Sequence, residues 1–182
     1  MKTALPGFAC ILIFISILSG CSPQPPMPTV PFVDLQRFMG DWYVIANIPT
    51  FIEEGAHDAV ENYRLAEDGT VATTFTFLAD SFDGEKKTYS PTGFVSDTYS
   101  NAVWEMQFIW PFKADYRIVY LDQDYRRTII ARKARDYVWI MSRTPTLTEA
   151  ELKEMIRFVK ELGYDETAVK TVPQRTEGRD AG

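Results

Sequence analysis

Few residues of this sequence belong to types that perform catalysis. His57 is the only histidine among 182 residues, and it lies in a predicted loop beside Glu53, Glu54 and Asp58. A single imidazole cannot build a histidine-rich metal site. A hydrolase would need His57 to meet a serine, and the sequence contains no G-x-S-x-G turn, phosphate-binding glycine loop or dinucleotide fingerprint. The sequence therefore predicts no catalytic residue, no metal and no cofactor.

The N-terminus carries residues for a different chemistry, covalent lipid attachment. Lys2 is the only charge in the first 33 residues, and it precedes the apolar run Phe8–Leu18. That run is shorter than the roughly 20 residues of a membrane-spanning helix, and it is typical of a secretory signal peptide. The stretch from Leu18 to Cys21 resembles a bacterial lipobox, which implies removal of residues 1–20 and lipidation of Cys21. An ordinary signal peptide with a chance cysteine is the alternative.

Residues 21–31 form the next segment, a predicted tether. Five prolines between Ser22 and Pro31 favour an extended, semi-rigid spacer that would hold the domain off a membrane. Ser22 after the cysteine resembles enteric lipoproteins sorted to the outer membrane, which implies an anchor there with the domain facing the periplasm. Because Cys10 leaves with the signal and Cys21 is lipidated, no disulfide is expected.

The composition is that of a folded, acidic domain. The chain is 46% hydrophobic and 24% charged, with a net charge of −6. This leaves ample apolar surface for a core and argues against a nucleic-acid partner, which would require a basic surface. The length fits one domain, expected over residues 32–173 and followed by a flexible tail over 174–182.

Alternating apolar and polar residues predict strands with one buried face. Pro91 and Gly93 indicate a bulge or an edge in the fourth of them. Eight strands at short spacing favour an all-β up-and-down barrel or a sandwich. The predicted strands are Gly40–Asn47, Ala59–Ala66, Thr70–Ala79, Lys86–Asp97, Ala102–Trp110, Tyr116–Leu121, Tyr125–Ala134 and Tyr137–Ser142.

One helix is predicted after the strands. Thr148 and Glu151 have the spacing of a capping box, and Gly163 supplies a C-terminal stop. Between them, apolar residues recur at i, i+3, i+4 and i+7 from Leu152, which gives one stripe for packing on a sheet. A short extended segment, Ala168–Val172, follows the helix.

Three separated motifs resemble the conserved regions of the lipocalin family. Leu121 departs from the pattern, since many lipocalins carry threonine before the aspartate of the second motif. Together with the lipobox, the resemblance is to bacterial outer-membrane lipocalins, relatives of apolipoprotein D. It implies an eight-stranded antiparallel β-barrel with a C-terminal α-helix packed outside. The motif residues are Gly40 and Trp42, then Asp122 and Tyr125, then Arg143.

The motifs imply structural roles at one end of that barrel. Trp42 is expected to plug the end, with Arg143 lying across the indole as a cation–π partner and a short helical turn formed by Val33–Phe38. The loops after strands one, three, five and seven then surround the open mouth. The longest of them, Pro49–Asp58, is the predicted lid.

Inward-facing positions follow from alternation, which places Val44 and Ala46 on the side of Trp42. Such residues can fill a core, and an aromatic stripe alone favours that interpretation. The lipocalin resemblance instead implies a hollow barrel, whose apolar walls would suit an acyl chain. The predicted ligand-binding residues of the interior and lid are Val44, Phe51, Phe75, Phe77, Trp104, Met106, Phe108 and Trp110.

Basic residues near the predicted mouth are candidates for binding a phosphate head group. They are Lys113, Arg132, Lys133 and Arg135, of which Lys133 and Arg135 are the predicted contacts; a solvated surface scatter is the alternative. The resemblance implies fatty acids or lysophospholipids as ligands, carried without chemistry. A structural envelope lipoprotein with a filled barrel and a lipid-modifying enzyme are the alternative functions. A homodimer is left open, since the sequence does not fix the oligomeric state.

Overall fold

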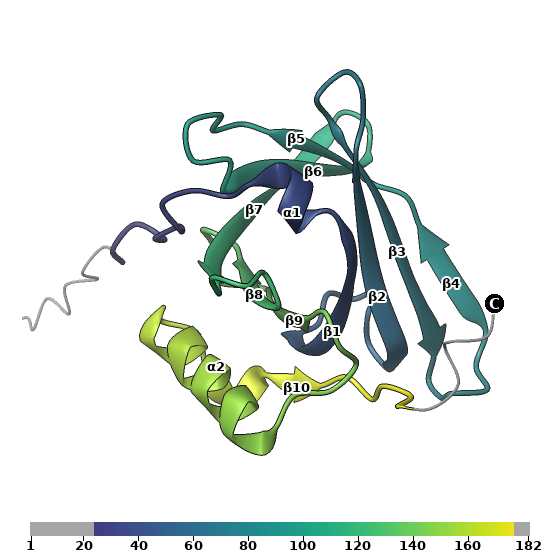
Figure 1. Ribbon diagram of the computed structural model, residues 1–182. Coiled ribbons are helices and arrows are strands. Elements are labelled where there is room, and N and C mark those ends of the chain that lie inside the picture. The colour runs from purple at the N-terminus through teal and green to yellow at the C-terminus, as the bar shows by residue number, and fades with distance from the viewer. Residues whose placement is uncertain (1–23, 177–182) are drawn as a thin grey trace, which may run out of the picture.

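The β-sheet of this protein closes on itself. In the computed structural model, which describes residues 24–176, antiparallel strands follow one another around a barrel of eight strand positions, and pairing of β1 with β9 completes the ring (Figure 1). Closure removes the unpaired edges that an open sheet exposes. The predicted eight-stranded barrel is therefore confirmed. The predicted signal peptide and Cys21 lie outside the described residues.

The elements follow the chain in order, and most neighbouring strands are joined by short turns. The helices are α1 (Leu35–Phe38) and α2 (Glu149–Glu161), with a 3₁₀ turn, η1 (Glu166–Ala168). The strands are β1 (Gly40–Ile48), β2 (Ala56–Leu65), β3 (Val71–Ala79), β4 (Lys86–Tyr89), β5 (Thr92–Val95), β6 (Val103–Ile109), β7 (Phe112–Leu121), β8 (Arg127–Ala131), β9 (Val138–Ser142) and β10 (Lys170–Thr171).

Some strand boundaries differ from the sequence prediction. The predicted strand 86–97 is two strands, β4 and β5, because Pro91 has no N–H to donate to a ladder. Its carbonyl instead accepts a hydrogen bond from Thr73 N at 3.1 Å. β7 begins at Phe112, earlier than predicted. The prediction missed its first residues because they show no alternation of buried and exposed positions. His57, predicted in a loop, lies in β2.

A β-bulge in β1 changes which side chains face the interior. The pairing of β1 with β9 shifts between Val44 and Ala46. Val44 is buried inside the barrel with Trp42, whereas Ala46 is buried between the barrel and α2. The inward prediction for Ala46 is wrong, because an extra residue in one strand reverses the alternation beyond it.

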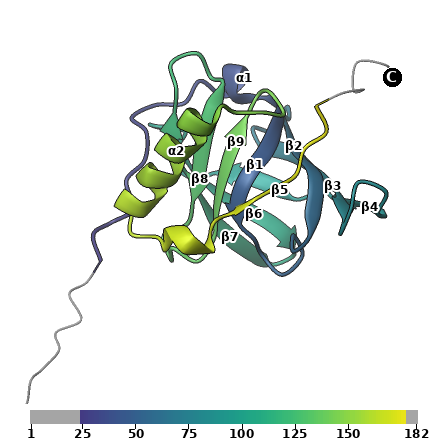
Figure 2. The same cartoon turned by 90° about the horizontal axis from the view of Figure 1, so that it is seen from below.

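Helix α2 covers the outer face of β8 and β9 (Figure 2). Thr148 N donates to Glu151 Oε2 at 2.9 Å and Glu151 N donates to Thr148 Oγ1 at 3.3 Å, so the predicted capping box is present. Met155 and Val159 are buried against the barrel, as the apolar stripe predicts. Within residues 24–176, no helix combines the length and apolarity needed to cross a membrane.

One end of the barrel is sealed by α1 and Trp42. The fully buried indole donates from Nε1 to Phe38 O at 2.9 Å. The Arg143 guanidinium lies 3.8 Å from the indole centroid and donates to the carbonyls of residues 37, 38, 39 and 41. Burial lowers the pKa of Arg143 to about 10, so the side chain stays cationic at neutral pH. The predicted plug and its cation–π partner are both present.

The remaining motif residues hold the backbone near the same end. Asp122 Oδ1 accepts from Arg126 N at 2.7 Å in the β7–β8 turn. Tyr125 takes a left-handed φ of 59° there, and its hydroxyl accepts from Asp34 N at 2.8 Å. Gly40 has a φ of 95°, which side chains other than hydrogen strongly disfavour. These contacts join the β7–β8 turn to the segment that carries α1.

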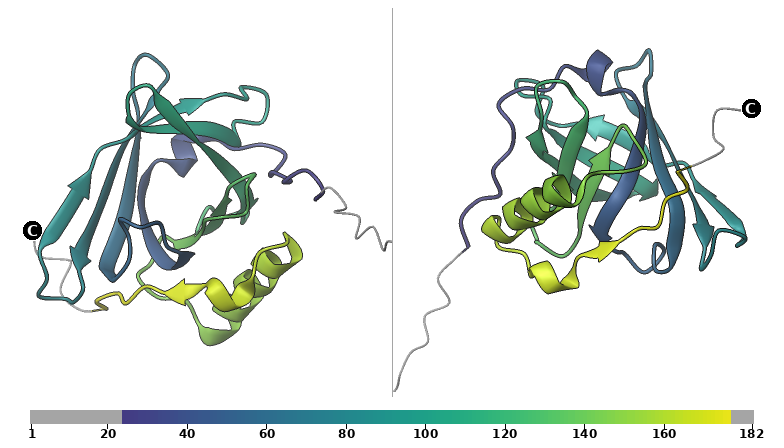
Figure 3. Two further views of the ribbon diagram at one scale, coloured as in Figure 1. Left: turned by 180° about the vertical axis from the view of Figure 1, so that it is seen from behind. Right: turned by 60° about the horizontal axis from the view of Figure 1, so that its bottom comes forward.

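The N-terminal segment lies along the outside of the barrel. The backbone N–H groups of Val33 and Val30 donate to barrel carbonyls at 2.8 and 3.0 Å. Met27 is buried in the cluster beneath α2, and Pro25 O accepts from Arg135 Nη2 at 2.7 Å. In the right panel of Figure 3 the purple segment runs from α1 down the barrel side toward α2. The described part of the predicted tether is therefore held against the barrel rather than forming a free spacer.

The C-terminal residues are also attached to the sheet. β10 pairs with β1, and Gln174 Nε2 donates to carbonyls of β1 and β2 at 2.8 and 3.0 Å. Arg175 forms an ion pair with Asp58 at 3.6 Å. The predicted tail over 174–182 thus begins with residues bound to the barrel, and its last six positions lie outside the described residues.

Candidate functional site

The half of the barrel away from the closed end is hollow. A cavity of about 450 Å³ opens between the loops at that end, which is the mouth of the barrel. Its walls are aromatic and aliphatic, the surroundings that an apolar ligand requires. The main apolar side chains that line it are Phe75, Tyr89, Met106, Phe108, Tyr116 and Trp139 from the strands, with Phe51, Ile52, Ile109 and Tyr137 at the rim.

A group of aromatic rings separates the cavity from the closed end. Trp104 and Tyr116 stack with ring centroids 5.4 Å apart. Phe38 and Tyr63 lie edge-on to Trp104, at 5.5 and 5.7 Å. Trp104 is fully buried, so no ligand reaches past it without displacing this group. The barrel is therefore filled by side chains in its lower half, next to the closed end, and hollow in its upper half, next to the mouth. Small barrels can be completely filled or can hold one ligand, and this barrel combines the two.

A carboxylic acid lies on the wall of this apolar cavity. Glu61, from β2, accepts a hydrogen bond from the hydroxyl of Tyr63, which in turn lies 2.5 Å from the hydroxyl of Tyr116. Burial raises the pKa of Glu61 to about 7 against the opposing effect of the Tyr63 hydrogen bond, and the nearby Glu53 raises it further. Both protonation states of Glu61 are therefore populated at neutral pH.

A second buried carboxylate ties the predicted lid to the barrel wall. In the β1–β2 loop, Glu53 Oε2 accepts from Thr50 N at 2.8 Å. Glu53 Oε1 accepts from the indole of Trp139, on β9, also at 2.8 Å. Burial raises the pKa of Glu53 as well. The loop that borders the mouth is therefore fixed to the wall at Glu53. Phe51, two residues earlier, is 87% exposed to solvent.

Four of the predicted ligand-binding residues line the cavity. Phe75 and Met106 are buried in its wall, and Phe51 and Phe108 are exposed at its rim. All four come from elements that surround the mouth, as the predicted polarity of the barrel requires.

The other predicted apolar residues lie elsewhere. Val44 and Trp104 belong to the packed lower half, and Phe77 stacks with Tyr89 at 6.2 Å. Trp110 is 81% exposed, because β6 ends at Ile109 and the chain turns before alternation can point the indole inward.

Among the basic candidates, Arg132 is the one whose side chain lines the cavity. Its Nη1 lies 3.3 Å from Asp136 Oδ2, and its Nε is buried with no hydrogen-bond partner within the part of the chain described. Lys133 is exposed. Arg135 lies against the end of α2, where Nε donates to Leu162 O at 2.6 Å. The geometry therefore shifts the head-group candidate from Lys133 and Arg135 to Arg132.

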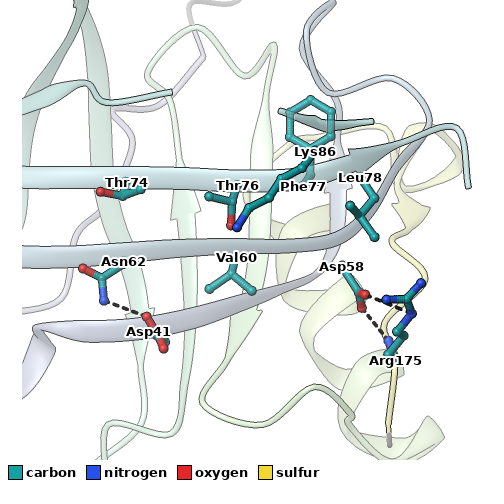
Figure 4. Close-up of a pocket in the computed structure, with 10 residues that line it drawn as sticks. All are labelled: Asp41, Asp58, Val60, Asn62, Thr74, Thr76, Phe77, Leu78, Lys86 and Arg175. Atoms are coloured by element: carbon teal, nitrogen blue, oxygen red, sulfur yellow. Dashed lines mark hydrogen bonds and ion pairs between the residues drawn. The ribbon is translucent and has the colours of Figure 1, made fainter. Parts of the chain in front are cut away.

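A second hollow, of about 510 Å³, lies on the outer face of β1, β2 and β3 (Figure 4). Asn62 donates to Asp41 there, and Asp58 pairs with Arg175 beside it. Its polar side chains and position outside the barrel make it a surface groove unsuited to an acyl chain.

Several cavity residues are missing from the sequence prediction. Glu61 could have been found, because it alternates with Ala59 and Tyr63 on the buried face of its strand, where a carboxylate is out of place. The contact between Glu53 and Trp139 could not, because 86 residues separate the two and neither belongs to a local motif.

Known proteins share both the sequence pattern and the fold. A family model described as a lipocalin-like domain matches residues 33–174. Outer membrane lipoprotein Blc of Citrobacter freundii is 29% identical over 163 residues, which cover 88% of this chain and 92% of that protein. Temperature-induced lipocalin-1 of Arabidopsis thaliana is 30% identical, over 81% of this chain and 83% of its own. Insecticyanin from the tobacco hornworm has a TM-score of 0.65 at 15% identity, over 87% of each chain. With the family model matching most of its length, the chain belongs to the lipocalin family.

Proposed function

We propose that this protein is a lipid-anchored lipocalin of the bacterial outer membrane that binds fatty acids or lysophospholipids in its barrel cavity and carries them without chemistry. Its similarity to proteins named outer membrane lipoprotein supports the location. The lipobox-like residues Leu18 to Cys21 support anchoring through a lipidated Cys21, with the domain facing the periplasm.

The observation that carries the proposal is the hollow half of the barrel. Its apolar walls favour an acyl chain, because each buried CH₂ contributes roughly 0.8 kcal/mol. A structural lipoprotein with a filled barrel would leave no such space. An enzyme gains no support from His57, since its Nδ1 lies 2.9 Å from Gly55 O and its ring lies against Phe82.

Filling the cavity is expected to weaken ligand binding. Ala114 lines the cavity from β7, so an Ala114→Trp substitution places an indole where the chain would lie. We expect the affinity for a fluorescent fatty acid to fall at least about tenfold, which corresponds to 1.4 kcal/mol. Fluorescence titration measures the affinity, and native mass spectrometry of protein purified from membranes identifies the bound lipid in the unmodified chain.

The matched control is Thr74→Trp, which adds the same side chain at an exposed position of β3. It should bind the fatty acid as the unmodified protein does. If both variants bind normally, or if the purified protein carries no lipid, the cavity is not a carrier site and the structural alternative gains support.

Arg132 is expected to select ligands with an anionic head group. Arg132 lines the cavity, and its ion pair with Asp136 uses Nη1, so the rest of the guanidinium fork can pair with a phosphate at the mouth. We expect Arg132→Gln to weaken lysophospholipid binding about tenfold or more, and to change binding of a long-chain alcohol less than twofold. Both affinities are measured by displacement of the same fluorescent fatty acid.

Lys133→Gln removes a neighbouring charge whose side chain is exposed, and it should leave both affinities unchanged. Equal losses for the phospholipid and the alcohol in Arg132→Gln would show that this residue supports the cavity without recognising a head group.

A further inference from the structure

The exposed apolar side chains of this protein are concentrated at the mouth of the barrel. Within residues 24–176, seven large apolar residues are exposed, and five of them belong to this group, which we name the mouth patch. Two of the five, Trp110 and Phe112, flank Pro111 at the tip of the β6–β7 hairpin and are 81% and 76% exposed. The mouth patch consists of Phe51, Phe108, Ile109, Trp110 and Phe112.

The mouth patch lies at the opening through which a ligand must pass, with Phe51 in the β1–β2 loop and the other four residues in the β6–β7 hairpin. Phe51, Phe108 and Ile109 each line the cavity as well as being exposed. Exposed apolar side chains gathered in this way mark a site of contact with a partner or a membrane. Tryptophan and other aromatic side chains are enriched where proteins meet the interface of a lipid bilayer.

The N-terminal segment reaches the same end of the barrel. Val33 lies at the closed end, where its N–H donates to Ser100 O. Eight residues earlier in the chain, Pro25 O accepts a hydrogen bond from Arg135 in the β8–β9 loop. That loop also provides Arg132 and Tyr137 to the cavity rim, so Pro25 lies near the mouth. The N-terminal segment therefore departs from the barrel at Pro25, on the side of the mouth and not at the closed end.

Chain length then limits how far the mouth can stand from the anchor. Cys21 precedes Pro25 by four residues, which span at most about 14 Å when fully extended. If Cys21 is lipidated, as the proposed function holds, the bilayer surface lies within that distance of Pro25, on the side of the barrel where the β8–β9 loop borders the mouth.

From these observations we propose that the barrel docks mouth-down on the bilayer that holds its anchor, with the mouth patch inserted in the lipid interface. This inference rests on the proposed lipid anchoring and adds the orientation of the domain. Ligand then passes between the bilayer and the cavity without crossing water.

Tryptophan quenching tests the docking directly. The lipidated full-length protein is reconstituted in vesicles of phosphatidylethanolamine and phosphatidylglycerol that contain brominated acyl chains. Of the four tryptophans, Trp42 and Trp104 are buried, Trp139 lines the cavity and Trp110 is exposed on the mouth patch. The part of the lipid quenching that disappears in Trp110→Phe therefore measures docking, whereas quenching that remains in this variant reports brominated chains bound in the cavity beside Trp139. Protein that floats with the vesicles yet shows no quenching of Trp110 overturns the docking and leaves the anchoring intact.

Flotation separates the two proposals. Cys21→Ser, which cannot be lipidated, should lose most of its vesicle association. If the unmodified chain also fails to float, and Trp110 is not quenched, both the anchor and the docking are refuted. Quenching of Trp110 in Cys21→Ser protein would support docking by the mouth patch independently of the anchor.

Transfer kinetics test the consequence. A Trp110→Ser/Phe112→Ser double variant should take up a fluorescent fatty acid from vesicles at least fivefold more slowly, with unchanged affinity for the same fatty acid in detergent-free solution. Tyr99→Ser is the matched control, because Tyr99 is 90% exposed in the β5–β6 loop near the closed end. Equal uptake rates in the double variant and the control would refute transfer through a docked mouth.

Discussion

Replacing Trp42 with alanine is expected to lower the free energy of unfolding by about 3–5 kcal/mol, the usual range for a fully buried tryptophan. The substitution removes the indole that Arg143 lies against at 3.8 Å, and it removes the hydrogen bond to Phe38 O. It also leaves a void at the closed end, which α1 cannot fill because its carbonyls are held by Arg143. Chemical denaturation measures the change.

Trp42→Ala is not expected to alter the cavity itself. Trp42 lies below the aromatic group around Trp104 and does not line the cavity, so the folded fraction should bind a fatty acid within about twofold of the unmodified affinity. Trp110→Ala is the control, since the same change at an exposed position should alter stability by less than about 0.5 kcal/mol. Unchanged stability with lost binding in Trp42→Ala would reverse the assignment of Trp42 from structure to ligand contact.

Glu61 is expected to make the protein less stable as the pH rises through neutrality. Its pKa is about 7 in the folded protein and near 4.5 when unfolded. Below pH 4.5 both states are protonated, and the group has no effect. Between 4.5 and 7 the unfolded state loses its proton first, so the stability falls and the full loss is present above pH 7. The pKa difference corresponds to a loss of up to about 3 kcal/mol.

Glu61→Gln keeps the acceptor for Tyr63 but cannot ionise. We expect it to match the unmodified protein near pH 4.5 and to be more stable by up to about 3 kcal/mol at pH 8. Denaturation at several pH values measures this, with Glu67→Gln in the exposed β2–β3 turn as the control. If the difference between Glu61→Gln and the unmodified protein does not change with pH, Glu61 is not a titrating group in this range.

The same titration is expected to act on ligand binding. An acyl chain against Glu61 excludes water and favours the neutral carboxyl, so fatty acids should bind more tightly at pH 6 than at pH 8. Glu53, Asp115 and Arg132 also line the cavity, and the pKa of Glu53 is raised too. Glu61→Gln should therefore reduce this pH dependence without removing all of it.

Local patterns were sufficient to predict most of the fold. The capping box at Thr148 and the stripe from Leu152 are properties of adjacent residues, so the sequence predicts α2 closely. Trp42 and Arg143 are distant in sequence, and their contact followed from the family resemblance rather than from periodicity. The prediction that Ala46 faces the interior was wrong, because the bulge in β1 reverses the faces of the residues that follow it in the strand. An alternating pattern of apolar and polar residues does not reveal such a bulge.

The cavity was less predictable than the fold. Alternation separates inside from outside, but it does not tell the filled half of the barrel from the hollow half, so Trp104 and Met106 look alike in sequence. Arg135 illustrates a different limit. Its position in a turn at the mouth suggests a head-group contact, whereas its guanidinium donates hydrogen bonds to the carbonyls of Pro25 and Leu162. Long-range hydrogen bonds of this kind have no local signal.

The division of the fourth strand position into β4 and β5 has a consequence for the width of the mouth. Within residues 24–176, β4 pairs with β3 alone, while β5 continues the ladder to β6. Around Tyr89 the wall is therefore held by one main-chain ladder, on the β3 side, together with the stacking of Tyr89 on Phe75 and Phe77 of the same strand. The width of the mouth at this point depends on that single ladder and those rings, whereas β6, between β5 and β7, is fixed by a ladder on each side.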